Sequence, residues 1–228
     1  MSLRNEKLLS DEYYHIYNRG NNKSRIFLDK EDYDRFEKIL YICNSENNFV
    51  FRESIIKSKI SAWDFERGNR LVDIGVWVIM PNHFHIMLIS SSHRQGLWQK
   101  DLNPISIYMQ KVSTAYAMYF NKKYSHIGSI FEGKFKSKLI SKENYLEYLF
   151  SYIHLNPIKL IQKDWKESGI KDMNKAFIYL NNYKYSSYLD YKNEKRKENS
   201  IINKEFFPNS FKKILKKGLI EIYNSYQP

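Results

Sequence analysis

The feature that most constrains the fold is a pair of strand-like runs joined by a two-residue turn, over residues 72–89. Residues 72–80 are rich in β-branched and aromatic side chains, and residues 83–89 form a second apolar run. Between them, Pro81 and Asn82 suit the two central positions of a β-turn. So short a connection predicts a β-hairpin, because it brings the two strands together antiparallel.

Periodicity and capping signals predict the elements around this hairpin. We expect a strand over 12–20, a helix after the cap residue Asp29, a helix from Pro104 to about 121–124, a bent strand or extended loop over 127–140, and a helix from the cap residue Ser141 to Asn156. The order β-α-β-β-α predicts an α+β fold close to a ferredoxin-like (RRM-like) arrangement, with an antiparallel sheet and helices packed on one face.

The chain is expected to form one main domain over residues 1–190. Residues 191–228 are interpreted as a charged linker, centred on 192–198, and a C-terminal helical extension over about 211–223. The segment from 49 to 70 is ambiguous, since its pattern fits a strand, an inserted basic loop or a short helix.

Cysteine content and hydropathy indicate the compartment. The chain has one cysteine, Cys43, which excludes an intrachain disulfide. It lacks an apolar run of the roughly 20 residues that a membrane helix needs, and residues 1–7 lack the apolar core of a signal peptide. We therefore expect a cytoplasmic protein with no membrane partner.

The charge balance favours a polyanionic partner. The 37 basic and 25 acidic residues give a net charge of +12, which points to nucleic acid, although a lysine-rich coding bias would also raise it. Four basic residues are candidates for DNA contact: Arg19, Lys134, Lys136 and Lys138. The three lysines occupy alternate positions and so share one face of an extended segment, but ordinary solvated charge explains them equally well.

The return strand of the hairpin begins with His83-Phe84-His85. Side chains alternate along a strand, so the two imidazoles lie on one face and Phe84 on the other. Two imidazoles that are completed by oxygen ligands suit Mg²⁺, Mn²⁺ or a similar divalent metal. The alternative is a pair of histidines that only hydrogen-bond within the fold.

A second string, over residues 152–157, could complete this site. Tyr152 and Asn156 are one helical turn apart, on the stripe expected to face the sheet. A buried carboxamide needs a polar partner, and a metal held by the histidines could be one. The alternatives are a helix cap before a proline for Asn156 and a core aromatic for Tyr152. His154 should face away, and three tyrosines of the preceding helix should pack in the core: Tyr108, Tyr116 and Tyr119.

Taken together, these strings resemble the single-tyrosine HUH transposases, in particular the REP-associated tyrosine transposases and their insertion-sequence relatives. The resemblance rests on residues 80–88, 152–157, 14–21 and 133–137 and spans about 12–190. It implies a ferredoxin-like nuclease core and a divalent metal. By position it also implies His83 and His85 as the metal-binding pair, Asn156 as a third ligand and Tyr152 as the nucleophile.

The expected function is therefore cleavage and rejoining of single-stranded or hairpin-flanked DNA through a 5′-phosphotyrosine intermediate. One tyrosine per chain suits either a homodimer or successive use of a single site. Two alternatives stay open. The chain could be an RRM-like module that binds a nucleic-acid hairpin without cutting it, or a metal-dependent nuclease that uses water.

Overall fold

The computed structural model describes residues 8–47, 55, 57–90, 103–211, 214 and 218–225. In chain order its strands and α-helices are β1 (Tyr13–Arg19), α1 (Lys30–Ile42), β2 (Asp73–Met80), β3 (His83–Ile89), α2 (Pro104–Tyr124), β4 (Lys136–Ile140), α3 (Glu143–Leu155), α4 (Trp165–Ser168), α5 (Met173–Asn182), α6 (Tyr188–Tyr191) and α8 (Leu219–Ser225). Short 3-10 helices cover Asn21–Lys23, Ala62–Asp64, Asn156–Leu160, Lys197–Ile201 and Lys204–Phe206. Within these ranges the structure contains no helix of the length and apolarity required to cross a membrane.

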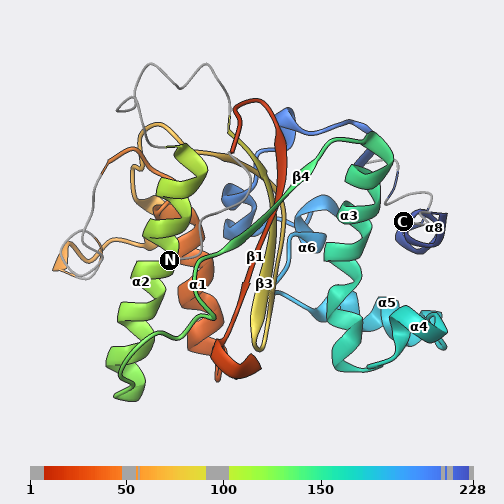
Figure 1. The fold of residues 1–228 in the computed structure, drawn as a ribbon, viewed down its shortest axis with the longest axis horizontal. Helices are drawn as coiled ribbons and strands as arrows, with labels where there is room; N and C mark the ends of the chain where they lie inside the picture. Colours follow the sequence, from red (N-terminus) through yellow and green to blue (C-terminus); the bar gives the residue numbers. More distant parts are fainter. Residues whose placement is uncertain are drawn as a thin grey trace.

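The four strands form one antiparallel sheet in the order β2-β3-β1-β4. Figure 1 shows this sheet nearly edge-on. Met80 pairs with His83, so Pro81 and Asn82 are the two turn residues of the predicted hairpin. The predicted α+β class with an antiparallel sheet is confirmed. Residues 49–54 and 56 of the ambiguous segment lie outside the described residues, and Ala62–Asp64 in the rest of it forms a 3-10 helix.

Local capping chemistry explains where two of the helices begin. Asp29 and Asp32 form a reciprocal capping box at the start of α1. At the start of α2, the side chain of Asn103 accepts from the Ile105 amide at 2.9 Å, with Pro104 in the first helical turn. The predicted cap at Ser141 is wrong: the N-cap of α3 is Lys142, whose side chain makes no capping bond.

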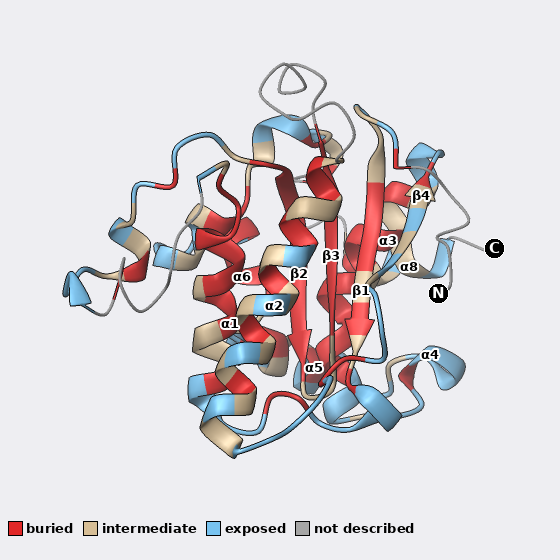
Figure 2. Ribbon diagram, turned by 60° about the vertical axis from the view of Figure 1, so that its left-hand side comes forward, coloured by how far each residue is buried: buried red, intermediate tan, exposed pale blue. Residues whose placement is uncertain are grey.

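Helices cover both faces of the sheet. Phe84 of β3 packs against Phe36 of α1, with ring centroids 5.0 Å apart. The next residue, His85, points the opposite way and meets Tyr152 of α3, so α1 and α3 lie on opposite faces (Figure 1). The expectation of helices on one face is therefore wrong. Its physical reason is visible in Figure 2: β2 is buried along its whole length, and a sheet that is buried on both faces needs a layer of helices on each side.

The residues after position 190 pack against the main body. Ile201, Ile202, Phe207 and Phe211 are buried, and the Asn203 amide donates to the Ile74 carbonyl of β2 at 2.8 Å. In the expected C-terminal helix the described part is α8, which lies alongside α3 (Figure 1); residues 212–213 and 215–217 lie outside the description. The division of the chain at residue 190 stays a prediction.

Candidate functional site

The two histidines of β3 form the centre of the candidate site. The rings of His83 and His85 meet edge to face, with centroids 5.0 Å apart and an interplanar angle of 82°. Burial lowers the pKa of His83 to about 4, with the positive charge of Lys159 as the next cause. Burial also lowers the pKa of His85 well below its ordinary value. Both imidazoles are therefore neutral at neutral pH, the form in which one ring nitrogen carries a free lone pair.

The turn before β3 orients the first imidazole. The side-chain oxygen of Asn82 lies 2.6 Å from Nδ1 of His83, and the same amide donates from Nδ2 to the Lys23 carbonyl at 3.1 Å. That second bond determines which end of the amide faces the ring, so Nδ1 of His83 must be the donor. In the neutral ring the lone pair is then on Nε2, which points away from the turn.

A third histidine, His15 of β1, lies beside this pair and was not among the predicted site residues. Its Nε2 is 2.9 Å from Nδ1 of His85, and burial, followed by the charge of Lys138, lowers its pKa to about 3. The sheet register puts Tyr17 opposite His85, so His15 is diagonal to His85 on the same face. The alternation of side chains along the first strand predicts which face His15 lies on. That this face meets His85 follows only once β1 is known to pair with β3.

Helix α3 brings the second predicted string to the histidines. The Tyr152 ring packs against His85 at a centroid distance of 5.6 Å and an angle of 74°. Asn156, directly after α3, is 1% exposed and hydrogen-bonds to His83, while its Nδ2 has no partner. The amide oxygen is therefore the atom that faces His83. The structure brings together all four residues that the sequence singled out, and their chemical roles stay predictions.

Two lysines that the sequence analysis did not select complete the surroundings. Lys166 of α4 donates from Nζ to the hydroxyl oxygen of Tyr152 at 2.9 Å, and Nζ lies 4.3 Å from the centroid of that ring. After burial, the positive charges of Lys159, Lys166 and Arg19 all contribute to the low pKa of His83. Lys159 lies in the 3-10 helix that begins at Asn156, and Lys166 lies in the four-residue helix α4. Elements this short have no regular periodicity that would mark the two lysines in the sequence.

The predicted DNA-binding residues have different environments. Arg19 forms a two-point ion pair with Glu132, with 2.9 Å between Nη2 and Oε1. Lys134, Lys136 and Lys138 are exposed, in and just before the edge strand β4. Lys138 also places Nζ 4.5 Å from the centroid of Tyr145. The three lysines are exposed at the surface, whereas the charge of Arg19 is partly compensated by Glu132.

Most of the competing residues pack as expected. The hydroxyls of Tyr108, Tyr116 and Tyr119 donate to fixed acceptors, respectively the Leu40 carbonyl at 3.1 Å, the Ile26 carbonyl at 2.5 Å and the Asp32 carboxylate at 2.9 Å. His154 is fully buried and its Nε2 lies 2.8 Å from the Ser187 hydroxyl. Tyr108 and Tyr116 are buried as predicted and His154 faces away from Tyr152, whereas Tyr119 is only partly buried and its oxygen also accepts from Lys123 at 3.1 Å.

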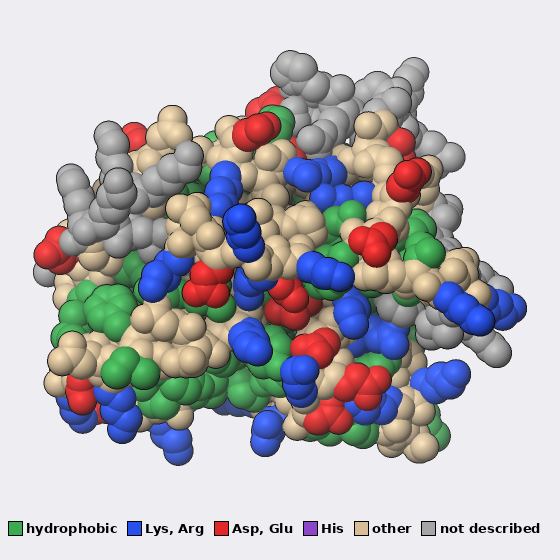
Figure 3. Space-filling model, turned by 180° about the vertical axis from the view of Figure 1, so that it is seen from behind, with side chains coloured by type: hydrophobic (Ala, Val, Ile, Leu, Met, Phe, Trp, Pro, Cys, Tyr) green, Lys and Arg blue, Asp and Glu red, His purple; other side chains and the backbone are tan. Residues whose placement is uncertain are grey.

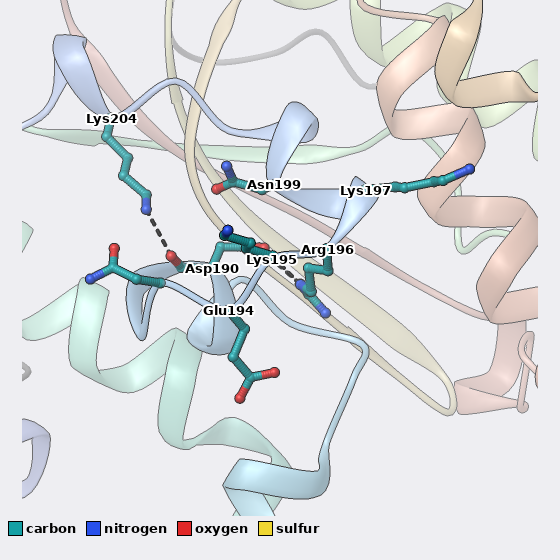
Figure 4. A pocket seen from close by; sticks show the side chains of 8 residues that line it. Asp190, Glu194, Lys195, Arg196, Lys197, Asn199 and Lys204 are labelled. Atoms are coloured by element: carbon teal, nitrogen blue, oxygen red, sulfur yellow. Dashed lines mark hydrogen bonds and ion pairs between the residues drawn. The ribbon is translucent and has the colours of Figure 1, made fainter.

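Other charged regions do not join the site. A hollow of about 530 Å³ lies over the segment expected to be a linker, but two of the four basic residues that line it, Arg196 and Lys204, are bound to Asp190 (Figure 4). On the face in Figure 3, lysine and arginine side chains alternate with acidic ones and form no single basic patch. Across the described ranges, no group of three or more His, Cys, Asp or Glu side chains could hold a metal.

Comparison with known proteins identifies similar folds. No protein-family model and no curated protein matches the sequence. Among solved structures, the fold is similar to that of a REP-associated tyrosine transposase bound to a REP hairpin, with a TM-score of 0.50 and 12% identity over 85% of this chain and 87% of that one. A bacterial tRNA(His) guanylyltransferase-like protein in complex with GTP matches with a TM-score of 0.38 and 10% identity, over 72% of this chain and 74% of its own. The tRNA(His) guanylyltransferase from Saccharomyces cerevisiae also matches with 0.38, at 13% identity over 93% and 87%.

Proposed function

We propose that this chain is a metal-dependent DNA strand transferase of the single-tyrosine HUH type, which cleaves and rejoins single-stranded DNA through a 5′-phosphotyrosine intermediate. The observation that carries the proposal is the meeting of Tyr152, His83, His85 and Asn156 from two distant segments on one face of the sheet. The β-α-β-β-α-β order and the strand order β2-β3-β1-β4 support a ferredoxin-like core. The likeness to a REP-associated tyrosine transposase bound to a REP hairpin agrees with it at the level of fold.

The hydrogen bonds of His83 fit a bound cation. A neutral imidazole has one N–H, yet His83 faces two amide oxygens, those of Asn82 and Asn156. His83, His85 and Asn156 are the residues that would hold a divalent ion, which would satisfy both His83 and the Asn156 oxygen. Two nitrogens and one amide oxygen leave coordination positions open, which suits Mg²⁺ or Mn²⁺. When bound, such an ion withdraws charge from a non-bridging phosphate oxygen.

The residues of the chain would perform the transfer itself. The hydroxyl oxygen of Tyr152 attacks the phosphorus, and the bond from phosphorus to the 3′-oxygen breaks. The new phosphotyrosine ester retains the energy of the phosphodiester, so a free 3′-hydroxyl can reverse the step and join a strand. The exposed lysines 134, 136 and 138 would neutralise the DNA backbone. Since each chain supplies one Tyr152, a full exchange needs either a homodimer or two successive uses of one site.

The test is detection of the covalent adduct. The protein is incubated with Mn²⁺ and a 3′-labelled pool of single strands that carry hairpins and random flanks, and products are separated on a denaturing gel. We expect label on the wild-type protein and none on Tyr152→Phe. Tyr116→Phe is the matched control and should retain the adduct, because its hydroxyl is bound to the Ile26 carbonyl in the core.

The same gel separates the rival functions. A hairpin-binding module would retain DNA on a native gel and form no adduct with any variant. A nuclease that uses water would release strands with free ends and stay active as Tyr152→Phe. An adduct formed by Tyr152→Phe would contradict the proposed nucleophile.

A further inference from the structure

We infer that Lys166 is a further catalytic residue, whose ammonium group stabilises negative charge on the Tyr152 oxygen during cleavage and rejoining. This inference rests on the proposed strand transfer. Lys166 follows Asn156 by ten residues in the sequence, and no sequence motif marks it. It contacts the reacting oxygen of Tyr152 directly.

The first observation is the direction of the hydrogen bond at the tyrosine. Lys166 donates to the Tyr152 oxygen at 2.9 Å. By contrast, the hydroxyl of Tyr116 donates its proton to a backbone carbonyl at 2.5 Å. An ammonium group that donates to a phenolic oxygen lies where it can interact with negative charge that develops on that oxygen. Tyr152 has such a donor, whereas Tyr116 donates to a carbonyl instead.

The step balances without a further reactant. In cleavage the bond between the Tyr152 oxygen and phosphorus forms, the bond from phosphorus to the 3′-oxygen breaks, and the phenolic proton passes to water while the departing 3′-oxygen takes one from water. Lys166 keeps its three protons and interacts with the charge that develops on the phenolic oxygen. In rejoining the same charge reappears as the phenolate departs, so one ammonium group serves both directions.

The second observation is a ring of contacts, here called the positioning circuit, that runs from Trp165 through Tyr223 and Tyr148 to Tyr152 and fixes the position of Lys166. Trp165, the preceding residue, is 1% exposed and packs against Tyr223 of α8 with ring centroids 4.9 Å apart. Tyr223 stacks on Tyr148 of α3 at 5.2 Å, and Tyr148 lies parallel to Tyr152 at 6.0 Å. The circuit returns to its start through the bond from Lys166 to Tyr152. Tyr223 is therefore a positioning residue, and this gives the C-terminal helix a role at the site.

The experiment compares the rate of adduct formation at saturating DNA with the affinity for DNA. The variants are Lys166→Met, Lys166→Arg and, as a matched control, Lys163→Met, which removes an exposed lysine three residues earlier. Affinity is measured by fluorescence anisotropy in EDTA, and rate with Mn²⁺ on the denaturing gel. We expect Lys166→Met to slow the adduct about 10- to 100-fold, the usual loss for one hydrogen bond to a charged group, with affinity changed less than about threefold. Lys166→Arg should recover most of the rate and Lys163→Met should match wild type.

A double-mutant cycle tests the positioning circuit. Tyr223→Ala should slow the adduct in the wild-type background and cause no further loss in the Lys166→Met background, because both changes remove one interaction. A Lys166→Met rate within twofold of a reactive wild type would overturn the inference and leave the strand-transfer proposal intact. Loss of affinity without loss of rate would also overturn it, since Lys166 would then bind DNA phosphate. A wild type that forms no adduct would overturn both.

Discussion

The two faces of the sheet use the same strand for opposite purposes. On the α1 and α2 face, Phe84 of β3 packs into an aromatic cluster with Phe36 and Tyr116. On the α3 face, the residues on either side of Phe84 are histidines, and the facing tyrosine is Tyr152. Tyr116 is fully buried and donates to a carbonyl, whereas Tyr152 is half-buried and accepts from a lysine. One face stabilises the fold, and the other carries the residues of the candidate site.

The comparison also shows which buried polar groups lower the stability of the fold. On the α3 face, His15 and His85 are buried and neutral, and the Nδ2 atom of Asn156 is buried without a partner. Burying polar groups in this way costs free energy, which the apolar face must offset. Perturbed groups of this kind concentrate at functional sites, but Glu37 of α1 is also buried with an unpartnered Oε1, so the clustering of the histidines, and not burial alone, distinguishes the α3 face.

The largest expected effect separates the two faces by stability. Phe84→Ala should lower the free energy of unfolding by about 3–5 kcal/mol, because it leaves a cavity in the aromatic cluster. His83→Ala should cost less than about 2 kcal/mol, since it removes a partly exposed ring with hydrogen bonds of about 1 kcal/mol each. Urea denaturation with and without Mn²⁺ measures both. Mn²⁺ should stabilise wild type and Phe84→Ala but not His83→Ala.

Two outcomes of that experiment would break the comparison. Equal losses for Phe84→Ala and His83→Ala would mean that both faces contribute alike to stability. Stabilisation of His83→Ala by Mn²⁺ to the same extent as wild type would place the ion elsewhere.

The next expected effect is on the pH dependence of the unfolding free energy. This dependence has opposite signs for the histidines of the α3 face and for Glu37 of α1. His15 has a pKa of about 3 and His83 of about 4, below the ordinary value near 6.5. Between the folded pKa of each histidine and the unfolded value near 6.5, the unfolded chain binds a proton that the folded chain does not. The free energy of unfolding should therefore fall as pH decreases from about 6.5 to 4, by about 1.4 kcal/mol per pH unit for each histidine. Glu37 of α1 differs: burial raises its pKa to about 9, so its contribution should fall as pH rises from about 4.5 to 9.

Substitutions separate the two pH effects. His15→Gln should flatten the dependence of unfolding free energy on pH between 5 and 7, where most carboxylates stay ionised. Glu37→Gln should flatten it between 7 and 9 and raise the stability at the upper end. Urea denaturation at each pH is the measurement, and a His15→Gln profile parallel to wild type would contradict the burial of a neutral imidazole at this position.

Local signals account for the parts of the fold that could be predicted. The Pro81-Asn82 turn and the caps at Asp29 and Asn103 act over two to four residues, so neighbouring letters are sufficient to identify them. The alternation that puts His83 and His85 on one face is equally local. The layer of helices on the second face was missed because it depends on what covers β2, and that is a matter of packing between distant segments.

The same distinction applies to the site. Tyr152 and Asn156 could be selected because one helical turn joins them, and the resemblance to a family supplied their connection to the histidines. His15 reaches His85 only through the pairing of β1 with β3. Lys166 reaches Tyr152 through a short helix whose place depends on the burial of Trp165. No local period encodes either contact.

The smallest expected effect concerns charge at the edge of the α3 face. Arg19 lies opposite His83 in the sheet and is paired with Glu132, and both side chains are well exposed, at 42% and 38%. Such a pair contributes only about 0–1 kcal/mol to stability, so Glu132→Gln should leave the unfolding free energy nearly unchanged. It should, however, leave the Arg19 charge without compensation beside the site.

The affinity for single-stranded DNA, measured at a series of salt concentrations, tests whether the uncompensated charge of Arg19 contributes to binding. Glu132→Gln should bind a few-fold more tightly at low salt and show a steeper salt dependence, by about one unit of slope. Glu205→Gln is the matched control, since it removes an exposed acid from a 3-10 helix near the C-terminus without freeing Arg19. If both variants gain equally, net charge alone explains the result. If the gain disappears in Arg19→Gln/Glu132→Gln, Arg19 contacts the DNA, and the α3 face extends as a binding surface to the end of β1.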